Sequence, residues 1–93
     1  MCVFYMKDAF NSAEDLPGAG QIFYDALNKA IQQNENIVVD MYGVSSLPSI
    51  FLNVSVGRII EERGKEELKA HVSFVKITKK QAMRLKDYFS RYN

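Results

Sequence analysis

The sequence predicts one domain of the α/β class, a small sheet of three to four mostly parallel strands packed by three helices. Its 93 residues, 47% of them hydrophobic, suffice for one ordinary core. Strand-like runs and segments of helical spacing alternate along the chain, in the order strand, helix, strand, helix, strand, helix. No repeat or linker interrupts this order, so residues 1–93 are expected to form a single domain.

The first third of the chain predicts a strand, a loop and a helix. Val3–Met6 is a short β-branched and aromatic run that fits an edge strand. Residues 11–20, NSAEDLPGAG, are polar and rich in Pro and Gly, which favours a loop. Between Gln21 and Gln33 apolar residues recur three and four apart, the spacing of an amphipathic helix.

The middle third predicts the centre of the sheet and a largely buried helix. Ile37–Val39 is a continuous β-branched run, typical of a central strand buried on both faces. Apolar residues then cover a wide arc from Ser49 to Arg63, which predicts one helix. Gly64 follows directly and suits a left-handed helix stop, because glycine carries no Cβ.

The last third predicts a strand and a helix. His71–Ile77 alternates as a strand with a more exposed face. Thr78 and Gln81 form a capping-box pattern, and a final helix is expected to run from there to about Tyr92.

Composition limits the setting in which the domain works. No apolar run approaches the length of a membrane span, and the single cysteine cannot form an internal disulfide, so a reducing cytoplasm is expected. The net charge of +1 is unevenly distributed, because residues 76–93 hold six basic residues against one acid. That segment carries +5, which leaves −4 for residues 1–75.

The segment from Asp40 to Ser49 follows the central strand, where open α/β sheets usually bind ligands or partners. It combines a carboxylate, a glycine turn at Gly43, three serines and a helix start that could favour an anion. A simpler interpretation is that Ser49 caps the helix and that Asp40 accepts hydrogen bonds from loop amides.

No catalytic set is apparent, and we expect neither an enzyme nor a cofactor. The single histidine, His71, opens a predicted strand and has no nucleophile at a fixed spacing. No His and Cys pair has metal-ligand spacing, so no metal is expected.

The basic last helix offers an alternative function. Lys79, Lys80 and Arg84 combine with aromatic residues as in nucleic-acid-binding proteins. A near-neutral pI lacks the usual electrostatic signature of such proteins, and the apolar spacing along this helix points its aromatic residues to the core.

Two neighbouring segments carry a family resemblance. Residues 38–44 (VVDMYGV) followed by 49–53 (SIFLN) resemble the STAS-like, DUF4325-type family, which is related to anti-sigma-factor antagonists. The match extends from Gly20 to the FVKI run at 74–77. The resemblance implies a cytoplasmic bacterial signalling protein that docks its strand-turn-helix on a histidine-kinase-like ATPase, under the control of serine phosphorylation.

The same resemblance shows where this chain departs from the antagonists. The family's phospho-acceptor position falls on Ile50, with Ser49 one place before it as the remaining candidate acceptor. Pro48 replaces the usual aspartate, and Phe51 replaces the usual glycine. These departures are closer to the STAS-like branch than to a true antagonist.

The leading hypothesis is therefore a non-enzymatic regulatory module that binds a protein partner through residues 40–53. The expected contact residues are Ser45, Ser46, Leu47, Ser49, Ile50 and Asn53, and the loop-shaping residues are Asp40 and Gly43. The alternative is a nucleic-acid-binding or sensory domain that uses Lys79, Lys80 and Arg84. The partner's identity and the oligomeric state do not follow from the sequence.

Overall fold

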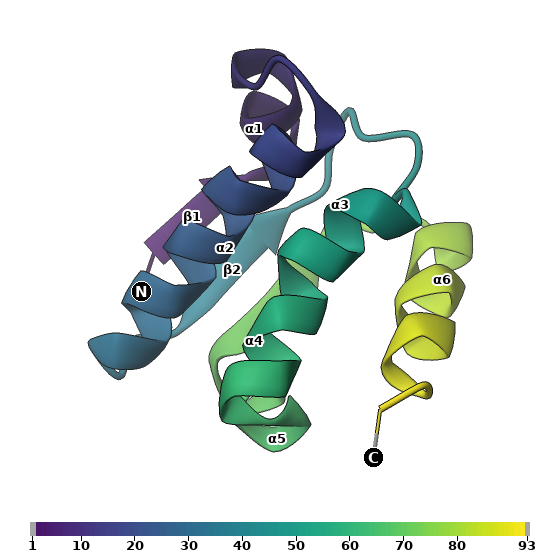
Figure 1. Ribbon diagram of the computed structural model, residues 1–93. Helices are drawn as coiled ribbons and strands as arrows, with labels where there is room; N and C mark the ends of the chain where they lie inside the picture. The colour runs from purple at the N-terminus through teal and green to yellow at the C-terminus, as the bar shows by residue number, and fades with distance from the viewer. Residues whose placement is uncertain (1, 93) are drawn as a thin grey trace.

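A computed structural model describes residues 2–92. Figure 1 shows a small sheet with a layer of helices. The elements are β1 (Cys2–Tyr5), α1 (Met6–Ser12), α2 (Leu16–Gln32), β2 (Ile37–Asp40), α3 (Ser49–Val54), α4 (Val56–Arg63), α5 (Lys65–His71), β3 (Val72–Val75) and α6 (Lys79–Phe89). No helix of this part of the chain has both the length and the apolar character of a membrane span.

The sheet has three parallel strands in the order β1-β2-β3. Its register aligns Tyr5, Asp40 and Val75 at the carboxyl end. The predicted α/β class, the parallel sheet and the central place of β2 are confirmed. The expected packing by three helices is wrong, because α1 and α5 are additional helices and the predicted middle helix is divided in two.

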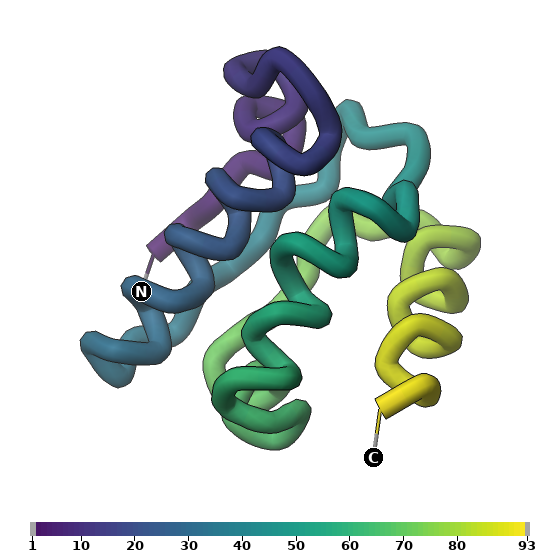
Figure 2. The backbone as a smooth tube through the Cα atoms, viewed as in Figure 1, coloured from purple at the N-terminus to yellow at the C-terminus, as the bar shows by residue number. Residues whose placement is uncertain are grey.

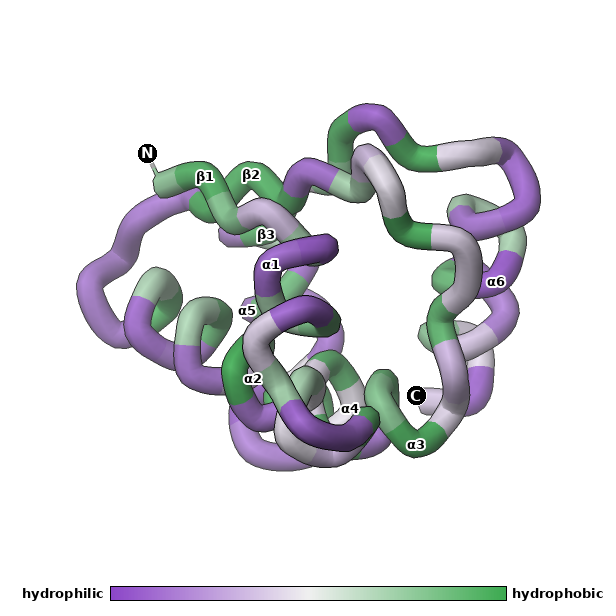
Figure 3. Tube along the Cα trace, turned by 90° about the horizontal axis from the view of Figure 1, so that it is seen from above, coloured by the Kyte–Doolittle hydropathy of each residue, from purple (hydrophilic) through white to green (hydrophobic). Residues whose placement is uncertain are grey.

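The helices that connect the strands, α1 to α5, lie on one side of the sheet, as Figure 3 shows from above, whereas α6 lies beyond the β3 edge. The strand order explains this arrangement, because successive right-handed crossovers that advance in one direction place their helices on one face. Ile37 and Val39 point to the helices and are buried, whereas Val38 lies on the open face and is half-buried. The expectation that β2 is buried on both faces is therefore wrong.

Aromatic side chains from β1, α2 and α3 build the core between sheet and helices. The Phe23 ring stacks on Phe51 at 5.8 Å between centroids and on Phe4 at 5.2 Å. A Cβ at Gly20 would lie 2.9 Å from the Phe51 carbonyl oxygen, so glycine permits the close approach of α2 and α3. This contact fixes α3 over the sheet.

The segment predicted as a loop at residues 11–20 is largely helical. Asp15 caps α2 by accepting a hydrogen bond from the Gly18 N–H at 2.8 Å. Pro17 falls in the first helical turn, where a missing N–H costs nothing, so it starts this helix. The helix predicted from Gln21 therefore begins five residues earlier, at Leu16.

The helix predicted over residues 49–63 is broken at Ser55. This residue has φ −107° and ψ −87°, and its buried hydroxyl donates to the Phe51 carbonyl. α4 then ends at Arg63, and the C-cap residue Gly64 has the expected positive φ of 91°. The chain continues into α5, so His71 ends a helix where the sequence predicted the start of a strand.

The capping box before the last helix is confirmed. The Thr78 hydroxyl accepts from the Gln81 N–H, and the Gln81 side chain accepts from the Thr78 N–H. α6 ends at Phe89, slightly before the expected Tyr92.

Candidate functional site

The loop at residues 41–48 joins the end of β2 to the start of α3. It passes beside α1 and then reaches α6, as the backbone path in Figure 2 shows. The carboxyl end of the central strand thus leads into a loop that lies between two helices. This is the location predicted for the site.

Asp40 fixes the start of this loop. Its carboxylate accepts a hydrogen bond from the Tyr42 N–H at 2.9 Å, as the simpler sequence interpretation expected. The same carboxylate lies 3.5 Å from the Lys76 ammonium, just after β3. Gly43 then turns the chain with φ +81°, a value that favours glycine.

Two side chains of α6 hold the loop in place. The Gln81 amide donates to the Val44 carbonyl, and Gln81 itself is only 5% exposed. The Arg84 guanidinium donates to the Leu47 carbonyl at 3.2 Å and to the Ser49 hydroxyl at 2.7 Å. The loop therefore has fixed polar contacts at both of its ends and in its middle.

Ser49 does not cap α3. Pro48 occupies the N-cap position and makes no side-chain cap hydrogen bond, so the expectation of a Ser49 cap is wrong. The Ser49 hydroxyl accepts a hydrogen bond from Arg84 instead, at an exposed position.

The predicted contact residues fall into two groups. Leu47 is buried and anchors the loop in the core, so its side chain lies below the surface. The exposed members are Ser45, Ser46, Ser49, Ile50 and Asn53. Ile50 is 50% exposed, a large fraction for an isoleucine at the start of a helix.

Asn53 extends the surface along α3 and is fixed from α6. Its side-chain oxygen accepts a hydrogen bond from the Tyr88 hydroxyl at 2.7 Å. Burial of Tyr88, followed by its hydrogen bond with Tyr92, raises the pKa of the Tyr88 phenol. Tyr88 therefore stays neutral and donates at physiological pH.

Two cavities flank the loop. One has a volume of about 250 Å³ and lies between the loop and α1, where Lys7 and Phe10 face Ser45 and Ser46. The other, of about 380 Å³, lies between the loop and Arg84 of α6. The loop and the two cavities together form an irregular surface of hydroxyl, apolar and basic groups.

The basic group predicted on the last helix is divided by the structure. Lys79 and Lys80 are exposed at the start of α6. Arg84 is half-buried and bound to the loop, so it serves the site at residues 40–53. The sequence did not indicate the contact of Arg84 with the loop, and it predicted only a capping role for Gln81. The sequence signal for the contact between α6 and the loop was a glutamine, Gln81, in the first turn of a helix with several basic residues.

The titratable groups suited to catalysis or metal binding are dispersed. Residues 2–92 hold no group of three His, Cys, Asp or Glu side chains that could bind a metal ion. The His71 ring is bound to the Glu67 carbonyl and to the Asn34 side chain, away from the loop.

Comparison with known protein families identifies the chain. The family model of the STAS-like domain of unknown function (DUF4325) matches residues 19–82. The chain belongs to this family. Neither a curated protein nor a solved structure gives a significant match.

The match to the STAS-like family covers the whole candidate site. Its range includes β2, the loop at residues 41–48 and α3, and it ends within the first turn of α6, just after Gln81. The resemblance found in residues 38–44 and 49–53 is therefore confirmed at the level of the family. Arg84 lies beyond the matched range.

Proposed function

We propose that this STAS-like domain is a non-enzymatic regulatory module that binds a protein partner through the surface of residues 40–53. The observation that carries the proposal is a loop held by side chains of α6 while the side chains of Tyr42, Ser45 and Ser46 remain exposed. Gln81 and Arg84 bind its carbonyl groups, and Ile50 projects beside it. A preformed loop loses little conformational entropy on binding, which favours recognition.

The partner that we propose is an ATPase domain of the histidine-kinase-like class. The support is membership of the STAS-like family. The resemblance described above relates this family to anti-sigma-factor antagonists, which bind such ATPases. The exposed side chains suit a protein interface, because an apolar anchor at Ile50 lies among hydroxyl and amide groups.

Phosphorylation of Ser49 is the proposed means of regulation. A phosphate there would add roughly −1.5 to −2 charges beside the Arg84 guanidinium, which already binds the hydroxyl at 2.7 Å. Lys80 lines the same cavity and adds a second cation. The modified serine would therefore be held against α6, and the surface presented to the partner would change.

A binding assay with the ATPase tests the proposal. The probe is a purified histidine-kinase-like ATPase domain from the same genome, with affinity measured by calorimetry. Burying the exposed half of Ile50 contributes about 1 kcal/mol, and Ile50→Glu would also bury a charge, so we expect affinity to fall more than about tenfold.

Met83→Glu is the matched control, because Met83 is 59% exposed on α6 and contributes to none of the cavities beside the loop. Equal affinity for the two variants and the wild type, with both variants folded, would contradict the proposed interface. The absence of any binding to the ATPase domain would contradict the proposed partner.

A further inference from the structure

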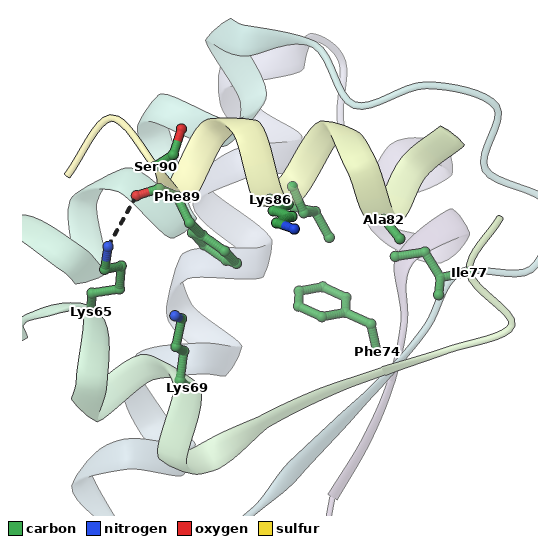
Figure 4. Close-up of a pocket in the computed structure, with 9 residues that line it drawn as sticks. Lys65, Lys69, Phe74, Ile77, Ala82, Lys86, Phe89 and Ser90 are labelled. Carbon is green, nitrogen blue, oxygen red and sulfur yellow. Dashed lines mark hydrogen bonds between the residues drawn. The ribbon is translucent and has the colours of Figure 1, made fainter. Parts of the chain in front are cut away.

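A third hollow lies on the opposite side of α6 from the loop. It has a volume of about 600 Å³ and separates β3 from α6 (Figure 4). Its lining combines the apolar side chains of Phe74, Ile77, Ala82, Leu85 and Phe89 with three lysines. Lys65 and Lys69 lie at one end, and Lys86 lies midway along α6 (Figure 4). We call this hollow the β3–α6 groove.

The groove runs along an unpaired edge of the sheet. β3 is the last strand, and its Val75 carbonyl accepts from the Met41 N–H on the β2 side at 3.0 Å. N–H and C=O groups of successive strand residues point to opposite edges, so those of Phe74 point to the free edge. Among residues 2–92, no backbone partner binds these two groups.

α6 lies on the far side of the groove from β3, so a fourth strand would lie between the two. The strands follow one another from β1 to β3, and α6 lies beyond β3 (Figure 1). Its Leu85 side chain lines the groove. The Phe89 side chain faces the groove together with the Phe74 ring from the strand (Figure 4). A strand added at this edge would therefore gain both backbone hydrogen bonds and an apolar cover.

The lysines around the groove indicate which kind of ligand would bind there. Lys65 is bound to the carbonyl groups of Phe89 and Tyr92, whereas Lys69 and Lys86 form no ion pair with the described residues. No acidic side chain lines the groove. Carboxylates are the groups that complement the charges of Lys69 and Lys86.

We propose that the β3–α6 groove binds an extended acidic segment of a partner protein, which adds a fourth strand at the edge of β3. Its backbone pairs with Phe74, as in other cases of strand addition. Its alternate apolar side chains enter the groove, and its carboxylates contact Lys69 and Lys86. This surface is independent of residues 40–53, because the two lie on opposite sides of α6.

A designed peptide tests strand addition directly. The probe is the capped ten-residue peptide EEVTVTVTEE, which places valines on one face and glutamates at both ends, so that either strand direction is served. On saturation with the peptide, hydrogen exchange at the Phe74 amide should slow at least about tenfold, because the amide gains a partner. Exchange in the loop at residues 41–48 should not change.

Control peptides separate the two parts of the proposal. KKVTVTVTKK reverses the charge, and EEVPVPVPEE keeps the charge but removes amide donors and strand geometry. Both should bind at least about tenfold more weakly. Binding of the lysine peptide equal to that of the glutamate peptide would overturn the charge complementarity.

Protein variants locate the site. The double variant Lys69→Glu, Lys86→Glu should weaken EEVTVTVTEE at least about tenfold, whereas Lys29→Glu on α2 should leave its affinity unchanged. Binding without slower exchange at Phe74, or no binding at about 1 mM peptide to the folded wild type, would overturn the proposal.

Discussion

Replacing Gln81 with methionine removes the polar link between α6 and the loop at residues 41–48. Methionine has a similar length and stays compatible with a buried helical position. The change deletes the donor to the Val44 carbonyl and the acceptor for the Thr78 N–H. It leaves the rest of the core intact.

The loss of stability follows from these two hydrogen bonds. Each hydrogen bond contributes about 1 kcal/mol to stability. The Val44 carbonyl belongs to a half-buried residue, so water only partly replaces the lost hydrogen bond. We therefore expect Gln81→Met to lower the free energy of unfolding by about 2 kcal/mol. For a domain of this size, that corresponds to a Tm lower by about 8–16 °C.

Urea unfolding followed by circular dichroism measures this loss, with Gln32→Met at an exposed position of α2 as the control. Amide exchange should also become faster in the loop than in α2, since the loop loses its support. A loss below about 0.5 kcal/mol, equal to that of the control, would refute the role assigned to Gln81.

Four further predictions address other parts of the molecule. Because burial raises the pKa of Tyr88 above its ordinary value of about 10, the unfolded chain releases a proton that the folded chain keeps. Stability should therefore fall as the pH rises above 10, with a contribution from Tyr88 of less than about 1.4 kcal/mol per pH unit, and urea unfolding of Tyr88→Phe should show a smaller slope than the wild type. Gly64→Ala should cost about 1–3 kcal/mol in thermal unfolding, because φ of 91° strains alanine although space for its Cβ is open. Leu47→Ala should lower stability by about 2–4 kcal/mol through a cavity, and an unchanged urea midpoint would contradict its buried anchoring role. Heparin should not retain the wild type at about 0.15 M salt, whereas retention that is lost on Lys79→Glu, Lys80→Glu would favour the nucleic-acid alternative.

Features set by local chemistry could be predicted from the sequence. The Thr78 and Gln81 pair forms its capping box within four residues, and the β-branched run at residues 37–39 forms the central strand. Gly64 follows the last residue of α4 with a positive φ, which glycine adopts readily because it carries no Cβ. The start of α2 is hidden in the sequence, because the Pro- and Gly-rich composition of residues 11–20 favours a loop although Asp15 caps the helix there.

Features set by distant contacts could not be predicted. The half-exposed state of Val38 depends on the direction of both crossovers, which no single segment specifies. Arg84 reaches Ser49 across 35 positions of sequence, so a solvent-exposed basic face was the natural expectation. The break at Ser55 depends on its buried hydroxyl, and the apolar spacing around it continues unchanged. The segment at residues 40–53 thus stays the predicted site, and the side chains of Gln81 and Arg84 that hold it come from a distant part of the sequence.

The most direct measurement is a titration of the ¹⁵N-labelled chain with an unlabelled histidine-kinase-like ATPase domain, followed by amide chemical shifts. The proposed interface predicts that the largest shifts fall on residues 42–53, and that they disappear in Ile50→Glu and persist in Met83→Glu. Shifts confined to other surfaces, or none at saturating ATPase, would contradict partner binding through the loop between β2 and α3.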